Sequence, residues 1–335
     1  MCLTKEQCYY IKGLSILLIM IHNFEDWLFG IVCNEMSYVQ SRTDVFLAGV
    51  FTKYSIWYVF AFAGWVGVAL FFFLSGYGLS KKYEEKRINK LDYMKIHFIK
   101  LWKLLIPIYI LYILVASCFF GESFSFINVI AQLTLTINLF QSGSINPGVY
   151  WFFGAIIQFY FLFLCIRKMN TKWLIAFMLL FLFFNYIILY FTNENTMEWT
   201  RHNFVGWAVP FLLGMIFARK KICFSKYNSR ILCSISFLFL SLCLTVKALI
   251  PLTEIVAIVF ILSFCDCFRI KVFFNIGVIS ASVFVIHPFV RLIILNTYCS
   301  SNYPLIMTTI YVSLVLSISW LHYRLLNYGK AHKVN

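Results

Sequence analysis

The feature that most constrains this chain is a series of apolar runs, each about as long as a helix that crosses a lipid bilayer. About 20 residues at a rise of 1.5 Å each span a hydrocarbon core roughly 30 Å thick. Such runs recur along all 335 residues and predict an all-α, polytopic integral membrane protein with about ten transmembrane helices. The predicted spans are 9–29, 56–79, 98–120, 150–167, 172–191, 203–218, 230–248, 250–266, 272–295 and 303–325.

The composition excludes the other classes of protein. The chain is 62% hydrophobic and only 12% charged, whereas a soluble domain has about 25% charged residues. Disorder requires low hydrophobicity, and a membrane β-barrel would show alternating segments of about ten residues. Because polar stretches are short, we expect a single transmembrane domain over residues 1–335 with no appended soluble domain.

The net charge of +15 suggests a nucleic-acid partner, but its distribution indicates membrane topology instead. If the N-terminus is inside, 23 of the 28 Lys and Arg residues fall in cytoplasmic segments. This asymmetry follows the positive-inside rule and predicts that both termini are cytoplasmic, with a lipid bilayer and no nucleic acid as partner. The five basic residues outside those segments are Arg42, Lys53, Arg201, Lys247 and Arg291.

Three segments need separate interpretation. The seventh and eighth runs are separated by 249–251 alone, which predicts a tight outer hairpin. Segment 124–140 is moderately apolar but contains Asn128, Gln132 and Asn138, so we expect an amphipathic or re-entrant piece on the outer side. The first run lacks the small-residue cleavage pattern of a signal peptide, so we interpret it as a membrane anchor.

The 11 cysteines do not indicate a metal site. They are scattered, and the close pair Cys265 and Cys267 has no second pair to complete a zinc site. In a membrane-spanning chain most cysteines act as small apolar residues.

His22 is the first ionisable residue that falls deep inside a predicted span. It lies ten residues after Lys12, so it is about 15 Å deeper in the membrane, near the middle of the hydrocarbon core. An imidazole at that depth suits a general base acting on a hydroxyl, although it can also simply hydrogen-bond another helix. Asp26 follows at i+4 and Glu25 at i+3, and a carboxylate there would fix the ring tautomer unless it lies at a solvated helix end.

His287 is the second intramembrane histidine. It follows Ser280 by seven residues, on nearly the same helix face, and precedes Pro288, which frees a backbone carbonyl and adds local polarity. The pattern is typical of either a polar site or a kinked helix with one satisfied histidine. We predict His22, Asp26 and His287 as catalytic residues.

Short motifs follow one another in a specific order along the chain. They are Lys12-Gly13 with His22, FFFLSGY at 71–77, KLWKLLIPIY at 100–109, Trp151-Phe152-Phe153 with Gln158-Phe159-Tyr160, PFLLG at 210–214, and Ile279-Ser280-Ala281-Ser282 leading to Ile286-His287-Pro288. In this order they resemble the acyltransferase-3 family of membrane acyltransferases over residues 9–290.

The resemblance implies transfer of an acyl group, usually acetyl from cytoplasmic acetyl-CoA, to a hydroxyl of a cell-surface polysaccharide, oligosaccharide or glycolipid precursor. It also implies a multi-pass protein of the bacterial cytoplasmic (inner) membrane, with acyl-CoA as donor substrate and no tightly bound cofactor. The family's basic residue and histidine of the first helix map to Lys12 and His22. A basic position of its third helix maps to Lys103, with Lys100 nearby.

Two positions depart from the family pattern. The first-helix basic residue of the family is commonly arginine, with ten residues between it and the histidine. Here it is Lys12, with nine residues between it and His22, which turns the pair about 80° apart around the helix. Ile156 and Ile157 stand where many members have acidic residues.

The donor requires cationic groups because CoA carries a 3′-phosphate and a pyrophosphate. Eight basic residues lie in the stretch 81–103, and for most of them positive-inside charge is the simpler interpretation. Lys100 and Lys103 continue into the third span, so with Lys12 they are predicted to bind the donor. On resemblance alone, Trp151 and Tyr160 are predicted to line the cavity for the carbohydrate acceptor.

Several alternatives remain open from the sequence. His22 serves either as a base or as a transient acyl carrier. A glycan transporter or flippase would also have about ten helices, but it predicts inverted repeats, and no internal symmetry stands out. A structural membrane protein would leave His22 and His287 unexplained.

Overall fold

The computed structural model describes residues 3–29, 40–52, 54–140, 145–220, 226–297 and 303–331. Helices dominate these residues, and no strand occurs among them, which confirms the prediction of an all-α membrane protein. Each of the ten predicted spans coincides with a helix. These helices are α1 (Lys5–Phe29), α3 (Ser55–Tyr83), α4 (Lys90–Phe120), α6 (Trp151–Ile166), α7 (Thr171–Phe191), α9 (Phe204–Lys220), α10 (Lys226–Thr245), α11 (Thr253–Cys267), α12 (Lys271–Thr297) and α13 (Pro304–Ala331).

Eight helices of the described part are long and apolar enough to cross a membrane, namely α3, α4, α6, α7 and α10 to α13. The other two predicted spans are α1, which carries Lys12, Glu25 and Asp26, and α9, which has 17 residues. The chain is therefore a multi-pass membrane protein.

Short elements connect the spans: α2 (Gln40–Val50), α5 (Phe126–Leu133), η1 (Ile137–Leu139), η3 (Gly148–Tyr150), α8 (Glu194–Arg201) and η4 (Lys247–Leu252). The short 3-10 helix η4 joins α10 to α11, in agreement with the predicted tight hairpin. Segment 124–140 forms α5 and η1, too short to span the membrane. It exposes Phe126 and Ile127 and buries Gln132 and Asn138 in the protein.

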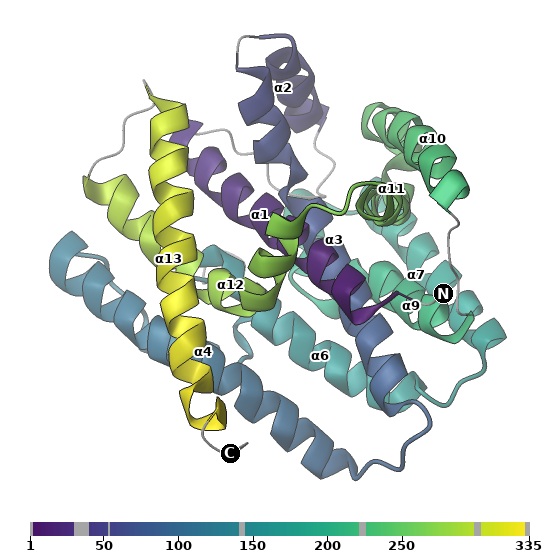
Figure 1. Cartoon of the computed structure of the whole chain (residues 1–335), viewed down its shortest axis with the longest axis horizontal. Coiled ribbons are helices and arrows are strands. Elements are labelled where there is room, and N and C mark those ends of the chain that lie inside the picture. The colour runs from purple at the N-terminus through teal and green to yellow at the C-terminus, as the bar shows by residue number, and fades with distance from the viewer. Residues whose placement is uncertain are drawn as a thin grey trace.

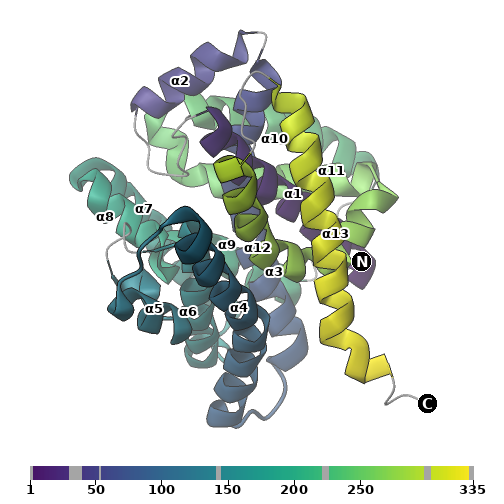
Figure 2. The ribbon, with the colours of Figure 1, turned by 90° about the vertical axis from the view of Figure 1, so that its left-hand side faces the viewer.

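The helices form a buried centre and a lipid-facing periphery. α3, α9 and α12 are largely buried, whereas most residues of α7, α10 and α13 are not. Figure 1 shows α10 at the upper right and α13 in the left half of the picture, and Figure 2 shows α7 and α13 on opposite sides. The central helices therefore hold most of their side chains away from lipid.

Paired glycines set the close crossings of the central helices. A Cβ atom at Gly13 of α1 would overlap the Phe273 carbonyl of α12, and one at Gly277 of α12 would overlap the Tyr9 carbonyl of α1. Such small-residue contacts bring helix backbones together where lipid provides no hydrophobic driving force. The glycine in the motif Lys12-Gly13 therefore has a packing role.

A second crossing of the same kind joins α3 to α9. A Cβ atom at Gly76 would overlap the Phe211 carbonyl, and one at Gly214 would overlap the Phe73 carbonyl. These two glycines belong to the motifs FFFLSGY and PFLLG, so both motifs form this contact.

Segments that were predicted to share one side of the membrane do lie together. Near the start of α1, the Gln7 amide donates to Asp266 of α11 at 3.2 Å, and Ser229 of α10 donates to the same carboxylate at 2.7 Å. Arg167, after α6, donates to the Tyr83 carbonyl at the end of α3 at 2.9 Å. The alternation of helix ends agrees with the charge pattern, and its assignment to the cytoplasm stays a prediction.

Candidate active site

His22 and His287 lie at the same depth on neighbouring helices. α1 and α12 run in the same direction, because they touch at Gly13 and Gly277 and again where Arg291 donates to the Asn23 carbonyl at 3.2 Å. From the glycine crossing, His22 is nine residues further along and His287 ten, about 14 and 15 Å. The two imidazoles interact electrostatically. The structure therefore brings together two histidines that are 265 positions apart in the sequence.

The His22 ring is buried against the backbone of α3. Its Nδ1 contacts the Ala61 carbonyl, and Gly64, one turn further along α3, leaves the space that the ring occupies. Since a carbonyl only accepts, Nδ1 carries the proton and Nε2 is the basic nitrogen. This assignment of the tautomer rests on the hydrogen bond to the Ala61 carbonyl.

His287 is fully buried and has the same tautomer. Its Nδ1 donates to the Val283 carbonyl at 3.1 Å, so Nε2 is the nitrogen without a proton in the neutral ring. That Nε2 is buried and has no hydrogen-bond partner among the described residues. A buried polar atom without a partner is costly, and it is a position where a substrate donor or a water molecule would be accommodated.

Arg291 adds a positive charge next to His287. It lies one turn after His287 on α12, is buried, and interacts electrostatically with His287 and Asp26. The charge pattern of the sequence assigns Arg291 to an outer segment, and its place in the site was not predicted. The i+4 spacing from His287 was the signal that could have identified it.

The two carboxylates of α1 face different neighbours. Asp26 lies on the side of Arg291, whereas Glu25 is buried and accepts a hydrogen bond from the Thr308 hydroxyl of α13. The Ala61 carbonyl occupies the position at His22 Nδ1 that the sequence suggested for a carboxylate. Asp26 therefore belongs to the same polar cluster through Arg291.

The three predicted donor ligands are not all together. Lys12 is partly buried, 5.5 Å from the Tyr9 ring centroid, and interacts electrostatically with Lys100 of α4. Lys100 and Lys103 are both exposed on α4. The structure thus groups Lys12 with Lys100 on the side of His22 toward the start of α1.

Trp151 and Tyr160 occupy separate aromatic clusters at different depths on α6. The Trp151 ring stacks on Trp207 at 5.9 Å and lies 5.2 Å from His202. Tyr160, about 13.5 Å further along the helix, lies 4.3 Å from the ring of His97 on α4. The two residues therefore do not line one common wall.

A hydrogen-bonded amide network holds segment 124–140 next to the Trp151 cluster. Asn138 donates to the His202 carbonyl at 3.1 Å and to the Asn203 side chain at 3.1 Å, and Gln158 donates to Asn203 at 2.8 Å. Gly154 of α6 leaves room for Asn138. Burial lowers the pKa of His202 to about 3, so this ring is neutral at pH 7.

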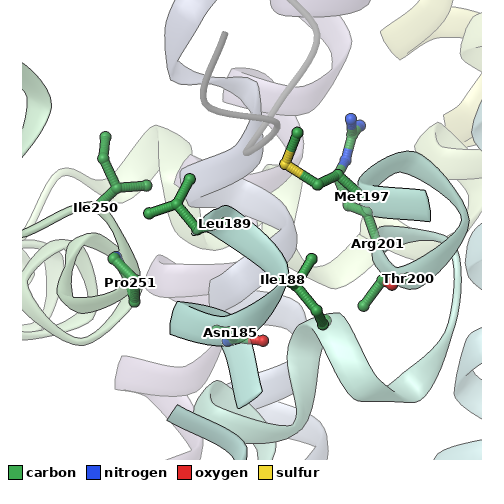
Figure 3. A pocket seen from close by; sticks show the side chains of 9 residues that line it. Asn185, Ile188, Leu189, Met197, Thr200, Arg201, Ile250 and Pro251 are labelled. Carbon is green, nitrogen blue, oxygen red and sulfur yellow. The ribbon is translucent and has the colours of Figure 1, made fainter. Parts of the chain in front are cut away.

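Two cavities differ in size and chemistry. The first, shown in Figure 3, is lined by residues of α7, α8 and η4, including Ile188, Leu189 and Pro251, and holds about 50 Å³. The second lies among the α3–α4 and α6–α7 connections and the end of α9, and holds about 870 Å³. Sites for substrates of drug size usually hold roughly 300–1,000 Å³, so only the second suits a large ligand.

The described helices form a multi-pass membrane bundle that buries a pair of histidines between its spans. A family model described as an acyltransferase domain matches residues 10–324. The chain belongs to the acyltransferase-3 family and is a membrane acyltransferase. No curated protein and no solved structure matches it significantly.

Proposed function

We propose that the protein transfers an acyl group, most simply acetyl, from cytoplasmic acyl-CoA to a hydroxyl of a cell-surface carbohydrate or its lipid-linked precursor. The membership of the family supports acyl transfer. The observation that carries the site is the pair His22 and His287, buried at one depth, each with Nδ1 on a backbone carbonyl. We further propose that the protein resides in the bacterial inner membrane.

In this mechanism, Nε2 of His22 accepts the proton of the acceptor hydroxyl as its oxygen attacks the acyl carbon. A C–O bond forms, and the thioester C–S bond breaks. The proton on His22 then passes to the departing thiolate, so that CoA leaves as a thiol. Arg291 stabilises the negative charge that develops on the acyl oxygen, and Asp26 balances the charge of Arg291 between turnovers.

The spacing of Lys12 and His22 matches the length of the donor. About thirteen bonds separate the pyrophosphate from the sulfur in CoA, as many as in roughly four residues of extended chain, or about 15 Å. Lys12 and His22 are ten residues apart on α1, also about 15 Å. Phosphates at Lys12 and Lys100 would thus place the thioester beside His22.

Of the two predicted aromatic residues, Trp151 is assigned to the acceptor and Tyr160 to the donor. Trp151 is at the end of α6 that is predicted to face outward, which suits a carbohydrate acceptor. Tyr160 lies next to His97, which interacts electrostatically with Lys100, so it fits the donor side better.

The central test compares thiol release from acetyl-CoA, with a glycan acceptor present, between the parent protein and His22→Gln. We expect release to fall by about a thousandfold or more, because the base is lost. His322→Gln on α13 is the matched control and should keep the parent rate. Equal rates for the parent and His22→Gln would remove His22 from the mechanism, and no release from any acyl-CoA would favour the transporter.

The orientation has its own test. A thiol reagent applied from outside the cell should label Asp44→Cys and fail to label Lys90→Cys, each measured against the parent background. The reverse pattern would overturn the donor side of the proposal.

A further inference from the structure

The cavity of about 870 Å³ lies at the end of the bundle that the charge pattern assigns to the cytoplasm. Three inter-helical segments form it: the end of α3 with the following loop, the connection from α6 to α7, and the end of α9. Its wall includes Lys81, Lys82 and Lys86, and the N-terminus of the 21-residue helix α7 opens on it at Asn170 and Thr171. None of these residues belongs to the histidine site.

Two arginines fix the shape of this cavity. Arg167 donates to the carbonyls of Tyr83 and Lys86, both at 2.9 Å, which holds the loop after α3. Arg219 of α9 pairs with Glu84 at 2.5 Å and donates to the Arg167 carbonyl at 2.7 Å. The walls are therefore tied together by buried or half-buried cations, so the cavity is preformed.

The charge of the cavity wall is positive. Arg219 and Glu84 neutralise each other, which leaves three lysines against the single carboxylate of Glu85. Lys82 and Lys86 form no ion pair with a carboxylate in the described part of the chain. Such a wall, with a helix N-terminus beside it, favours a ligand that carries several phosphate oxygens.

A path of basic and aromatic side chains leads from this cavity toward the histidines. Lys82 interacts electrostatically with His97, which also interacts with Lys100, and Lys100 interacts with Lys12. The His97 ring lies between the rings of Tyr93, at 4.4 Å, and Tyr160, at 4.3 Å, and is tilted against both. The cavity therefore lies beyond Lys12 and Lys100 on the far side from His22.

We infer that this cavity binds the phosphoadenosine end of the acyl-CoA donor, with Lys82 and Lys86 contacting its 3′-phosphate. The inference rests on the proposed function, because it adds a subsite to the same donor. The 3′-phosphate and the adenine nucleoside occupy the cavity, while the pyrophosphate reaches Lys12 and Lys100. This position explains how a chain of about 15 Å can deliver a thioester to His22 from a nucleotide held at the membrane surface.

The test uses the full-length double variant Lys82→Gln/Lys86→Gln. We expect the KM for acetyl-CoA to rise by about tenfold or more at unchanged kcat, since two charge-assisted contacts to phosphate are lost. The KM for acetyl-pantetheine, which lacks the nucleotide, should not change. Adenosine 3′,5′-bisphosphate should compete with acetyl-CoA in the parent and should do so about tenfold more weakly in the double variant.

The matched control is Lys90→Gln/Lys95→Gln, which removes two exposed lysines of the same region that do not line the cavity. If both double variants have the same KM for acetyl-CoA, the cavity does not bind the nucleotide and the inference is overturned, while acyl transfer itself stands. If the double variant also loses acetyl-pantetheine turnover, the lysines act on structure rather than on the nucleotide. If the parent releases no thiol from any acyl-CoA, the proposed function fails, and this inference with it.

Discussion

Gly64→Ala tests whether the position of the His22 ring controls the chemistry. The methyl group would overlap Cβ, Cγ and Cδ2 of His22. These atoms are close to the α1 backbone, so the side chain cannot rotate away from the clash. Instead α1 and α3 must separate, or the ring must leave the Ala61 carbonyl.

The size of the effect follows from the size of the overlap. An ordinary carbon contact requires the ring to move by about 1 Å. A displacement of 1 Å at a catalytic group costs about a hundredfold in rate, or roughly 2.7 kcal/mol in activation free energy. Loss of the bond from Nδ1 to Ala61 would also let the ring adopt the other tautomer. We therefore expect kcat to fall about a hundredfold.

The assay is thiol release from acetyl-CoA at saturating donor, with thermal unfolding measured in parallel. Gly78→Ala on the same helix is the control, because a Cβ there meets no atom within 4 Å and should leave both quantities unchanged. Parent-like kcat in a folded Gly64→Ala protein would refute the placement of His22 at the reacting atoms. If the melting temperature falls together with kcat, the loss of rate reflects a destabilised fold, and Gly64 serves packing alone.

Three further predictions concern stability, each measured as a melting temperature in detergent. Burial lowers the pKa of His202 to about 3, so unfolding is coupled to protonation below pH 6.5, and stability should fall by up to about 1.4 kcal/mol per pH unit between pH 6.5 and 3. His202→Gln should flatten that slope. Arg219→Gln should destabilise the protein by about 2 kcal/mol, because it leaves Glu84 and two carbonyl groups without their partner. Gly214→Ala should lower the melting temperature by several degrees, since its Cβ would overlap the Phe73 carbonyl.

Each of these predictions has a result that contradicts it. An unchanged acid slope in His202→Gln would mean that another group takes up the proton on unfolding. Parent-like stability of Arg219→Lys would show that a single charge suffices, whereas the three contacts of Arg219 require a planar fork. Gly214→Ala as stable as Gly78→Ala would show that the close crossing of α3 and α9 is not needed.

The sequence predicted the helices well because each span is a local property. All ten apolar runs coincide with helices, and the short segment 124–140 was separated from them by Asn128, Gln132 and Asn138. The depth of His22 and His287 in the membrane was also predictable, because each residue after the start of a helix adds a rise of 1.5 Å. What could not be predicted is which helices are neighbours.

The packing of the helices against one another determines which residues meet at the candidate site. Arg291 looked like an outer charge, and only the packing of α12 against α1 places it with Asp26. The partner of His22 Nδ1 is a backbone carbonyl of α3, which no side-chain pattern reports. Trp151 and Tyr160 share one motif, yet they lie in different clusters because about 13.5 Å of helix separates them.

The sequence by itself determined the membrane class, the spans and the two histidines, because hydrophobicity and helical rise act along the chain. The order of its motifs also indicated the family that the match over 10–324 shows. The tertiary structure alone determined the tautomer of His22 and the position of Arg291 in the candidate site. It also determined the basic cavity between three inter-helical segments. Those features arise from contacts between distant segments, where glycine crossings bring backbones and buried polar groups together in the absence of water.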